Sequence, residues 1–217
     1  MNSQLRTRVK ICGLTRLEDV HAAVQAGADA IGFVMYPKSQ RAVSLEQARE
    51  LRAAVPAFVN VVTLFVNATA QEVQDVIKLV QPDLLQFHGD ESPQFCESFN
   101  HRYFRAIRVG APGLDTPEGV LQTCLRYQSA SAWLFDSYSD AYGGSGLALD
   151  ASLLDLVQQA EDTRVAILAG GLTPDTVATS IKTMQPYAVD VSSGVEDAPG
   201  IKSSLKIQRF MAAVQSA

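Results

Sequence analysis

Two apolar runs in this sequence end in side chains that can exchange protons. The first run ends in Cys12, within Lys10–Gly13, and a later run, 132–135, is followed directly by Asp136. A thiolate is an effective base when a nearby cation favours it, and a partly desolvated carboxyl group can keep its proton and act as an acid. The pair points to general acid–base chemistry.

Short apolar or β-branched runs recur along the chain and predict strands, because the stretches between them have the spacing of amphipathic helices. The predicted strands are 9–12, 30–35, 60–66, 84–87, 103–109, 132–135, 165–169 and 188–191. The predicted helices include 17–26, 45–54, 70–80, 151–160 and 205–214.

Helix start signals support this reading. Ser44 precedes the second helix with Gln47 three residues later, and Thr69 precedes the third with Glu72 in the same relation. These are capping patterns. Thr173–Pro174 is expected to open the seventh helix, because proline suits the first turn.

Strict alternation of strands and helices predicts a parallel sheet with right-handed crossovers. Eight strand–helix units match a single-domain (β/α)8 TIM barrel over residues 1–217, with 1–7 as a flexible N-terminal tail. The main alternative is an open doubly wound sheet. That fold usually carries a Gly-x-Gly-x-x-Gly loop after its first strand, and the sequence following Cys12 has none.

Composition narrows the possible partners and location. The chain has 47% hydrophobic residues and a formal net charge of -5, so we expect no binding to nucleic acid or to an anionic membrane. The N-terminus lacks the apolar stretch of a signal peptide, which predicts a cytoplasmic protein. Three cysteines without ligand spacing predict neither a disulfide framework nor a zinc site.

In barrels of this kind, active sites form where the strands end. Alternation along the first strand puts Lys10 and Cys12 on the same side, so we expect the Lys10 ammonium to lower the pKa of the Cys12 thiol. The same rule turns Asp136 inward on the sixth strand. The alternatives are a cysteine that is only a small core residue and an aspartate that only caps a loop.

Glycine-rich loops follow the last three strands. Loops 168–172 and 190–195 are the two that frequently bind phosphate in this fold, because backbone N–H groups freed by glycine can converge on an anion. Loop 142–146 can cover a ligand. The alternative is that each glycine only turns the chain, but three such loops on one rim predict a phosphorylated substrate.

Taken together, these motifs resemble the phosphoribosylanthranilate isomerase family over nearly the whole chain. The segments that carry the resemblance are 10–13, 32–39, 86–89, 142–146, 169–172 and 188–196, together with Arg41 and Asp136. The resemblance implies a (β/α)8 barrel of tryptophan biosynthesis. It also implies an Amadori rearrangement without metal or organic cofactor.

The resemblance further implies roles for single residues. Asp136 matches the general acid that opens the furanose ring, Cys12 matches the general base that removes the proton from C2, and Arg41 matches the arginine that pairs with the anthranilate carboxylate. Without the resemblance, Arg41 would be read as a solvated loop residue. The positions assigned to phosphate are Gly144, Gly170, Gly171, Ser192, Ser193 and Gly194.

Three further residues are candidate substrate contacts. Lys10 lies beside the base. His88 faces inward at the end of the fourth strand, where a structural histidine is an equal alternative. Asp190 needs a partner at the end of the eighth strand and either pairs with Lys10 or touches the substrate.

Two other functions remain open on this sequence. A pentose-phosphate epimerase would need a metal held by histidines and carboxylates, and of the histidines only His88 is suitably placed. A phosphoribosyl-ligand binding or regulatory barrel would make Cys12 and Asp136 dispensable. The assembly is expected to be a monomer or homodimer, and we expect no turnover of the related histidine-pathway aminoaldose, because there is one phosphate site and one arginine for anthranilate.

Overall fold

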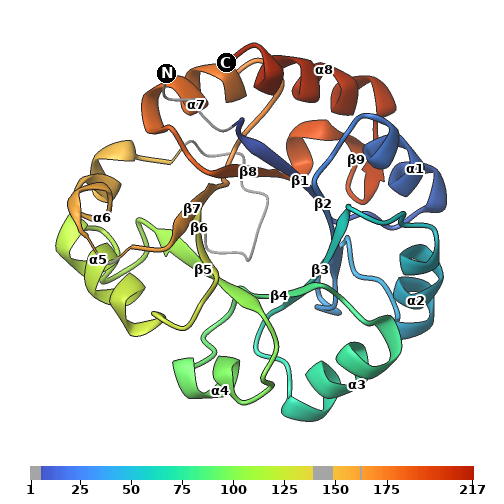
Figure 1. The fold of residues 1–217 in the computed structure, drawn as a ribbon, viewed down its shortest axis with the longest axis horizontal. Helices are drawn as coiled ribbons and strands as arrows, with labels where there is room; N and C mark the ends of the chain where they lie inside the picture. The colour runs from blue at the N-terminus through green and yellow to red at the C-terminus, as the bar shows by residue number, and fades with distance from the viewer. Residues whose placement is uncertain (1–5, 139–148, 162) are drawn as a thin grey trace.

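Eight parallel strands, β1 to β8, hydrogen-bond in sequence order and close into a barrel with the helices outside (Figure 1). This computed structural model describes residues 6–138, 149–161 and 163–217. Closure joins the first strand to the last, with Lys10 opposite Asp190. The predicted TIM barrel is thereby confirmed, and the open doubly wound sheet is wrong.

The elements alternate along the chain as expected. The strands are β1 (Arg8–Cys12), β2 (Ala30–Val34), β3 (Asn60–Phe65), β4 (Leu84–Phe87), β5 (Tyr103–Val109), β6 (Ala132–Ser137), β7 (Val165–Leu168), β8 (Ala188–Val191) and a small hairpin of β9 (Glu196–Ala198) and β10 (Ile201–Lys202). The helices are α1 (Leu17–Gln25), α2 (Leu45–Ala53), α3 (Ala70–Val80), α4 (Pro93–Glu97), α5 (Pro117–Arg126), α6 (Asp155–Gln159), α7 (Val177–Met184) and α8 (Ser204–Gln215), with 3-10 turns η1 (Ala151–Leu154) and η2 (Ser193–Val195).

Three sequence predictions need correction. β6 continues to Ser137, so Asp136 lies within the strand rather than after it. The predicted helix 151–160 is divided between η1 and α6. The seventh helix begins at Val177, because Thr173 and the proline after it form a separate turn, in which the Val177 amide donates to the Thr173 carbonyl.

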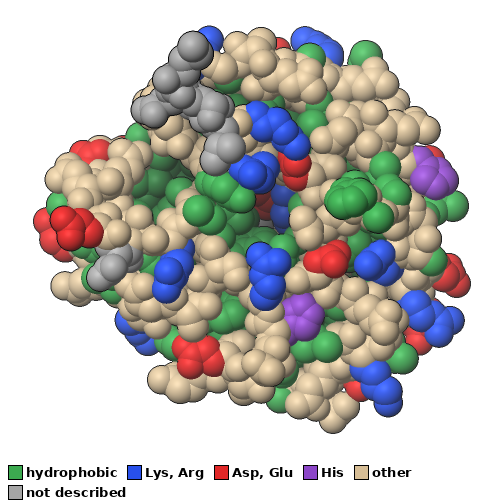
Figure 2. All heavy atoms as spheres, viewed as in Figure 1, with side chains coloured by type: hydrophobic (Ala, Val, Ile, Leu, Met, Phe, Trp, Pro, Cys, Tyr) green, Lys and Arg blue, Asp and Glu red, His purple; other side chains and the backbone are tan. Residues whose placement is uncertain are grey.

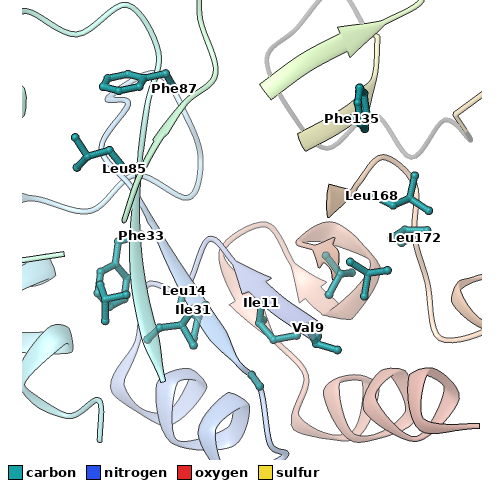
Figure 3. Close-up of a cluster of buried hydrophobic side chains, with 14 of the residues drawn as sticks. Val9, Ile11, Leu14, Ile31, Phe33, Leu85, Phe87, Phe135, Leu168 and Leu172 are labelled. Atoms are coloured by element: carbon teal, nitrogen blue, oxygen red, sulfur yellow. The ribbon is translucent and has the colours of Figure 1, made fainter. Parts of the chain in front are cut away.

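Apolar side chains fill both sides of the barrel wall. Odd-numbered residues of β1 and β2, such as Val9, Ile11 and Phe33, point outward and pack under the helices (Figure 3). The inward side holds smaller clusters, one of which contains Ala132 and Leu134 of β6. The alternation that placed these two residues inside the barrel is confirmed, and it carries Asp136 inward with them.

The surface seen in Figure 2 carries Lys and Arg side chains interspersed with Asp and Glu, with apolar side chains between them. Arg6, within the predicted N-terminal tail, forms a hydrogen bond of 2.9 Å from Nη1 to the Asp29 carboxylate. The flexibility of that tail stays a prediction. In the part of the chain that the structure describes, no helix is both long enough and apolar enough to cross a membrane.

Candidate active site

A cavity lies where the carboxyl ends of the barrel strands meet the loops. Every predicted site residue lines it except Lys10, Gly194 and Gly144; the last falls outside the described residues. The predicted residues on its wall are Cys12, Arg41, His88, Asp136, Gly170, Gly171, Asp190, Ser192 and Ser193.

Lys10 lies beneath the cavity and bridges two strands. Its ammonium donates a 2.9 Å hydrogen bond to Asp190 Oδ1, and both side chains are buried. Burial lowers the pKa of Lys10, but the charge of Asp190 and the contact with Cys12 outweigh it and hold the pKa above its ordinary value. The sequence left two partners open for Asp190, Lys10 or the substrate, and the structure shows the pair with Lys10.

Cys12 is buried beside this pair, and its ionisation differs from the sequence prediction. Burial raises the pKa of the Cys12 thiol above its ordinary value, and it outweighs the opposing effect of the Lys10 ammonium. The expected net lowering of this pKa is therefore wrong for the protein without ligand. Lys10 still stabilises the thiolate, but it offsets only part of the desolvation cost.

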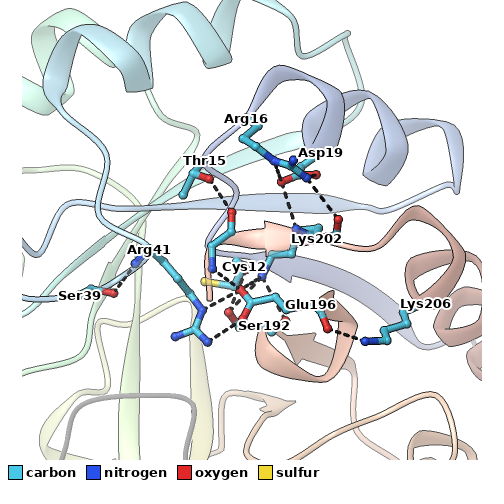
Figure 4. Close-up of polar contacts among 11 residues, drawn as sticks. Cys12, Thr15, Arg16, Asp19, Ser39, Arg41, Ser192, Glu196, Lys202 and Lys206 are labelled. Atoms are coloured by element: carbon cyan, nitrogen blue, oxygen red, sulfur yellow. Dashed lines mark hydrogen bonds and ion pairs between the residues drawn. The ribbon is translucent and has the colours of Figure 1, made fainter. Parts of the chain in front are cut away.

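Arg41 is half-buried rather than solvated. Its Nε and Nη2 donate to the two carboxylate oxygens of Glu196 at 2.8 and 2.7 Å, a bidentate pair (Figure 4). Lys202 donates to the same carboxylate at 2.7 Å. Burial alone would raise the pKa of Glu196, but the hydrogen bonds from Arg41 and Lys202 hold it below its usual range.

Asp136 and His88 meet across the cavity wall. His88 Nε2 lies 3.2 Å from Asp136 Oδ2, and His88 Nδ1 lies 3.0 Å from the amide nitrogen of Gln86. Gln86 and His88 are both buried on the inward face at the end of β4. The inward orientation predicted for His88 is thus observed.

The loops after β7 and β8 lie against each other. A Cβ at Gly194 would collide with the carbonyl oxygen of Leu172, so only glycine permits this backbone contact. Gly170 and Gly171 have φ angles of 81° and 64°, the left-handed region that glycine adopts freely. Ser192 Oγ donates to the Cys12 carbonyl at 3.0 Å and so ties the β8 loop to the end of β1.

Four residues of this region were given no role from the sequence. Gln86 was predicted to face inward, which was the available signal, and Glu196 ended a quoted motif. Gly32 leaves the space that Cys12 and Lys10 occupy. Lys202 had no local signal, although its ammonium donates to Ser192 and Glu196, only ten and six residues earlier in the chain. Nowhere among the described residues do three His, Cys, Asp or Glu side chains group so as to hold a metal ion.

Comparison with known proteins gives one consistent result. The sequence model of the N-(5'-phosphoribosyl)anthranilate (PRA) isomerase family matches residues 9–213. The chain is 58% identical to N-(5'-phosphoribosyl)anthranilate isomerase of Bordetella bronchiseptica, covering 98% of this chain and 97% of that protein. It is 52% identical to the isomerase of Pseudomonas fluorescens, with 96% and 95% covered.

Solved structures agree with the sequence matches. Phosphoribosyl anthranilate isomerase from Thermotoga maritima superposes with a TM-score of 0.86 at 38% identity, covering 97% of this chain and 100% of that one. A second isomerase structure holds reduced 1-(o-carboxyphenylamino)-1-deoxyribulose 5-phosphate. It has a TM-score of 0.83 at 36% identity, with 97% and 100% covered.

Proposed function

Because the chain belongs to the N-(5'-phosphoribosyl)anthranilate isomerase family, it catalyses the Amadori rearrangement of tryptophan biosynthesis, and we propose that Cys12 and Asp136 carry its proton transfers. The reaction converts N-(5-phosphoribosyl)anthranilate to 1-(2-carboxyphenylamino)-1-deoxyribulose 5-phosphate. One observation carries the assignment: a thiol, a carboxyl group, Arg41 and two glycine loops face a single cavity. The family match rules against the epimerase and the non-catalytic barrel.

Asp136 is the general acid in this proposal. It gives its proton to the furanose ring oxygen. The bond between that oxygen and C1 breaks with its electron pair going to oxygen, and the anthranilate nitrogen closes an iminium with C1. The negative charge that remains on Asp136 faces His88 Nε2 at 3.2 Å.

Cys12 is the general base. Its thiolate removes the proton from C2, and the electron pair of that C–H bond forms a C1–C2 double bond and neutralises the nitrogen. The adjacent iminium acidifies this proton, so a modest base suffices. Return of a proton to C1 and loss of one from the C2 hydroxyl give the ketone and restore both side chains.

The remaining site residues bind and orient the substrate. Glu196 engages Nε and Nη2 of Arg41, and we assign its Nη1 to the anthranilate carboxylate, an acceptor that suits a planar guanidinium. The phosphate is assigned to the loops after β7 and β8, through Gly170, Gly171 and Ser192–Gly194. Gly144 belongs to this assignment from the sequence, as do Lys10, His88 and Asp190 as substrate contacts.

The test is the loss of anthranilate-type fluorescence when purified protein meets freshly generated phosphoribosylanthranilate. Cys12→Ser and Asp136→Asn should each lower kcat by about 100-fold or more, the typical contribution of one positioned proton transfer. Cys124→Ser on α5 and Asp155→Asn on α6 are the matched controls and should keep the native rate. Near-native turnover in either site variant would contradict the role assigned to it.

Partners and location complete the proposal. The ligand is a phosphorylated small molecule, with no nucleic acid or membrane partner, and the enzyme works in the cytoplasm as a monomer or homodimer. One related solved structure is of engineered monomers of the dimeric T. maritima enzyme. The histidine-pathway aminoaldose is not accepted; detectable turnover of that compound would overturn this statement.

A further inference from the structure

Lys202 lies at the centre of a buried polar cluster behind the wall of the cavity. Its side chain is fully buried and, unlike those of Arg41 and Ser192, does not line the cavity. Nζ donates to Glu196 Oε1 at 2.7 Å, to the Ser192 carbonyl at 3.1 Å and to Ser192 Oγ at 3.3 Å (Figure 4). Three acceptors thus surround Nζ, which matches the three donors of an ammonium. Burial lowers the pKa of Lys202, and the bond to Glu196 opposes that change.

The main chain at Lys202 is held by the start of α1. The Lys202 amide donates to Asp19 Oδ2 at 3.2 Å, and Arg16 Nη2 donates to the Lys202 carbonyl at 3.3 Å. Arg16 and Asp19 also pair with each other, with 3.0 Å between Nε and Oδ2. The hairpin of β9 and β10 is therefore attached to the barrel, and the side chain of Lys202 extends from a fixed position.

On one side, Lys202 orients the peptide that begins the loop after β8. The Ser192 carbonyl points toward Lys202, and no peptide bond of the described residues is cis. In a planar trans peptide the N–H points opposite to the C=O, so the N–H of Ser193 points away from Lys202. Ser193 itself lines the cavity, in the loop to which the phosphate is assigned. The Ser192 hydroxyl also donates to the Cys12 carbonyl, which joins this peptide to β1.

On the other side, Lys202 shares the Glu196 carboxylate with Arg41. Oε1 accepts from Lys202 Nζ and from Arg41 Nε, and it also accepts the Gly200 amide at 3.3 Å. Oε2 accepts only from Arg41 among these groups. Two cations share one carboxylate, so the three side chains together keep one positive charge. Arg41 is the cation that lines the cavity, and this charge is therefore available to an anionic ligand there.

We propose that Lys202 is a positioning residue that joins the phosphate end of the substrate site to the carboxylate end. Through Ser192 it turns the Ser193 N–H toward the phosphate. Through Glu196 it fixes the Arg41 guanidinium and keeps it positive toward the anthranilate carboxylate. One buried ammonium thus prepares the site for both anionic groups of the substrate. This inference rests on the assignment of those two groups under the proposed function.

The test compares three ligands by isothermal titration calorimetry. The full ligand is reduced 1-(o-carboxyphenylamino)-1-deoxyribulose 5-phosphate, the compound held by one related structure. The second ligand lacks its phosphate, and the third has phenyl in place of carboxyphenyl. The affinity ratio of the first to the second measures phosphate recognition, and that of the first to the third measures carboxylate recognition. A merely structural role would lower the number of binding sites but leave both ratios unchanged.

Lys202→Met should lower both ratios, because an unbranched apolar side chain removes all three hydrogen bonds. The carboxylate ratio should fall by about fivefold or more, since Glu196 then neutralises Arg41 and the bond to the ligand loses strength. The phosphate ratio should fall by about threefold or more, since the Ser193 N–H is no longer oriented. Lys78→Met, an exposed change on α3, is the matched control and should leave both ratios unchanged.

A measurement on the native enzyme keeps the proposal testable if Lys202→Met does not fold. Inorganic phosphate is added to ¹⁵N-labelled protein, and the Nε–H signal of Arg41, identified with Arg41→Lys, is followed. We expect it to move together with the amide signals of Ser193 and Gly194, because Lys202 connects the two ends. Movement of the amide signals alone would overturn the proposal. The Nε–H signal of Arg126, exposed on α5, should stay in place.

The outcomes separate this inference from the function it rests on. If the native enzyme binds all three ligands equally well, the phosphate and carboxylate assignments themselves fail. If it distinguishes them but Lys202→Met keeps both ratios, those assignments stand and Lys202 positions neither end. If only one ratio falls, Lys202 serves that end alone and does not join the two, which also contradicts the proposal.

Discussion

The Cys12 thiol is packed so tightly that the residues around it leave no room for an additional side chain. A Cβ at Gly32 would lie 2.9 Å from Cys12 Sγ, closer than real Cβ contacts, and 3.1 Å from Lys10 Nζ, closer than most of them. Any side chain at this position would therefore displace the Cys12 thiol or the Lys10 ammonium. A misplacement of 1 Å can cost about 100-fold in rate, so under the base role proposed for Cys12 a side chain here should lower kcat.

The ionisation of Cys12 gives a prediction for the protein without ligand. Its alkylation by iodoacetamide should speed up with rising pH and reach its midpoint above pH 9.0, because burial raises the pKa of this thiol above that ordinary value. Lys10→Met should slow alkylation at pH 9, since the ammonium that opposes burial is gone. Mass spectrometry of peptides reports the site of modification.

The controls for this measurement lie in the same chain. Burial raises the pKa of Cys96 and Cys124 to about 12, and neither rate of alkylation should respond to Lys10→Met. Lys38→Met removes an exposed ammonium and should not change the Cys12 rate. A midpoint near pH 7 would instead support the lowering that the sequence pattern suggested.

Helix starts are the elements most firmly encoded by local sequence. Thr69 Oγ1 accepts the Glu72 amide at 3.3 Å, while the Glu72 carboxylate accepts the Thr69 amide at 2.7 Å, a complete capping box on α3. Ser44 caps α2 with one such bond, accepting the Gln47 amide at 3.2 Å, while the Gln47 side chain donates to the Thr15 carbonyl instead. The donor and the acceptor of such a cap lie within four consecutive residues, which is why these helix starts could be predicted from the sequence.

Removing this cap should destabilise the barrel by a measurable amount. Thr69→Ala is expected to lower the free energy of unfolding by about 1 kcal/mol, because helix N–H groups lose their acceptor. Urea unfolding followed by circular dichroism measures the change. Thr123→Ala, within α5, should show no comparable loss, and an equal loss there would argue against the capping explanation.

The less predictable elements follow from interactions beyond the local pattern. The Thr176 side chain closes the turn that begins at Thr173, because its Oγ1 accepts the Thr173 amide at 3.0 Å. The first residue of α7 is therefore Val177, after this turn. β6 runs on to Ser137 because β5 continues beside it, with Val109 opposite Ser137. Neither effect is visible in hydrophobic spacing.

At the scale of the molecule, Glu196 joins segments that are remote in sequence. It pairs with Arg41 from the loop after β2 and with Lys202 of β10. Such partners lie 155 residues apart in the first case, and no periodicity relates them. By contrast, the Lys10–Asp190 pair could be anticipated, because both residues lie on inward faces of strands that a closed barrel brings together.

Glu196→Gln should therefore change how stability depends on pH. Because the folded protein holds the pKa of Glu196 below its ordinary value of 4.5, the stabilisation is present above about pH 4.5 and is lost as pH falls through the lowered pKa. The variant should be less stable by about 3 kcal/mol at pH 6, and the gap should narrow toward pH 3. Urea midpoints across this range measure it.

Glu46→Gln, an exposed change on α2, serves as the control and should leave the curve close to that of the native protein. A gap between native protein and Glu196→Gln that stays constant from pH 6 to pH 3 would show that the ionised carboxylate is not its cause.

The seam between β1 and β8 sets when the site can exist during synthesis. Asp190 leaves the ribosome 180 residues after Lys10, which at typical elongation rates is a delay of about 10 to 35 seconds. Until then the ammonium beside Cys12 lacks its carboxylate, and the barrel lacks the strand that closes it. A nascent chain thus carries the thiol for most of its synthesis without the closed barrel that buries it.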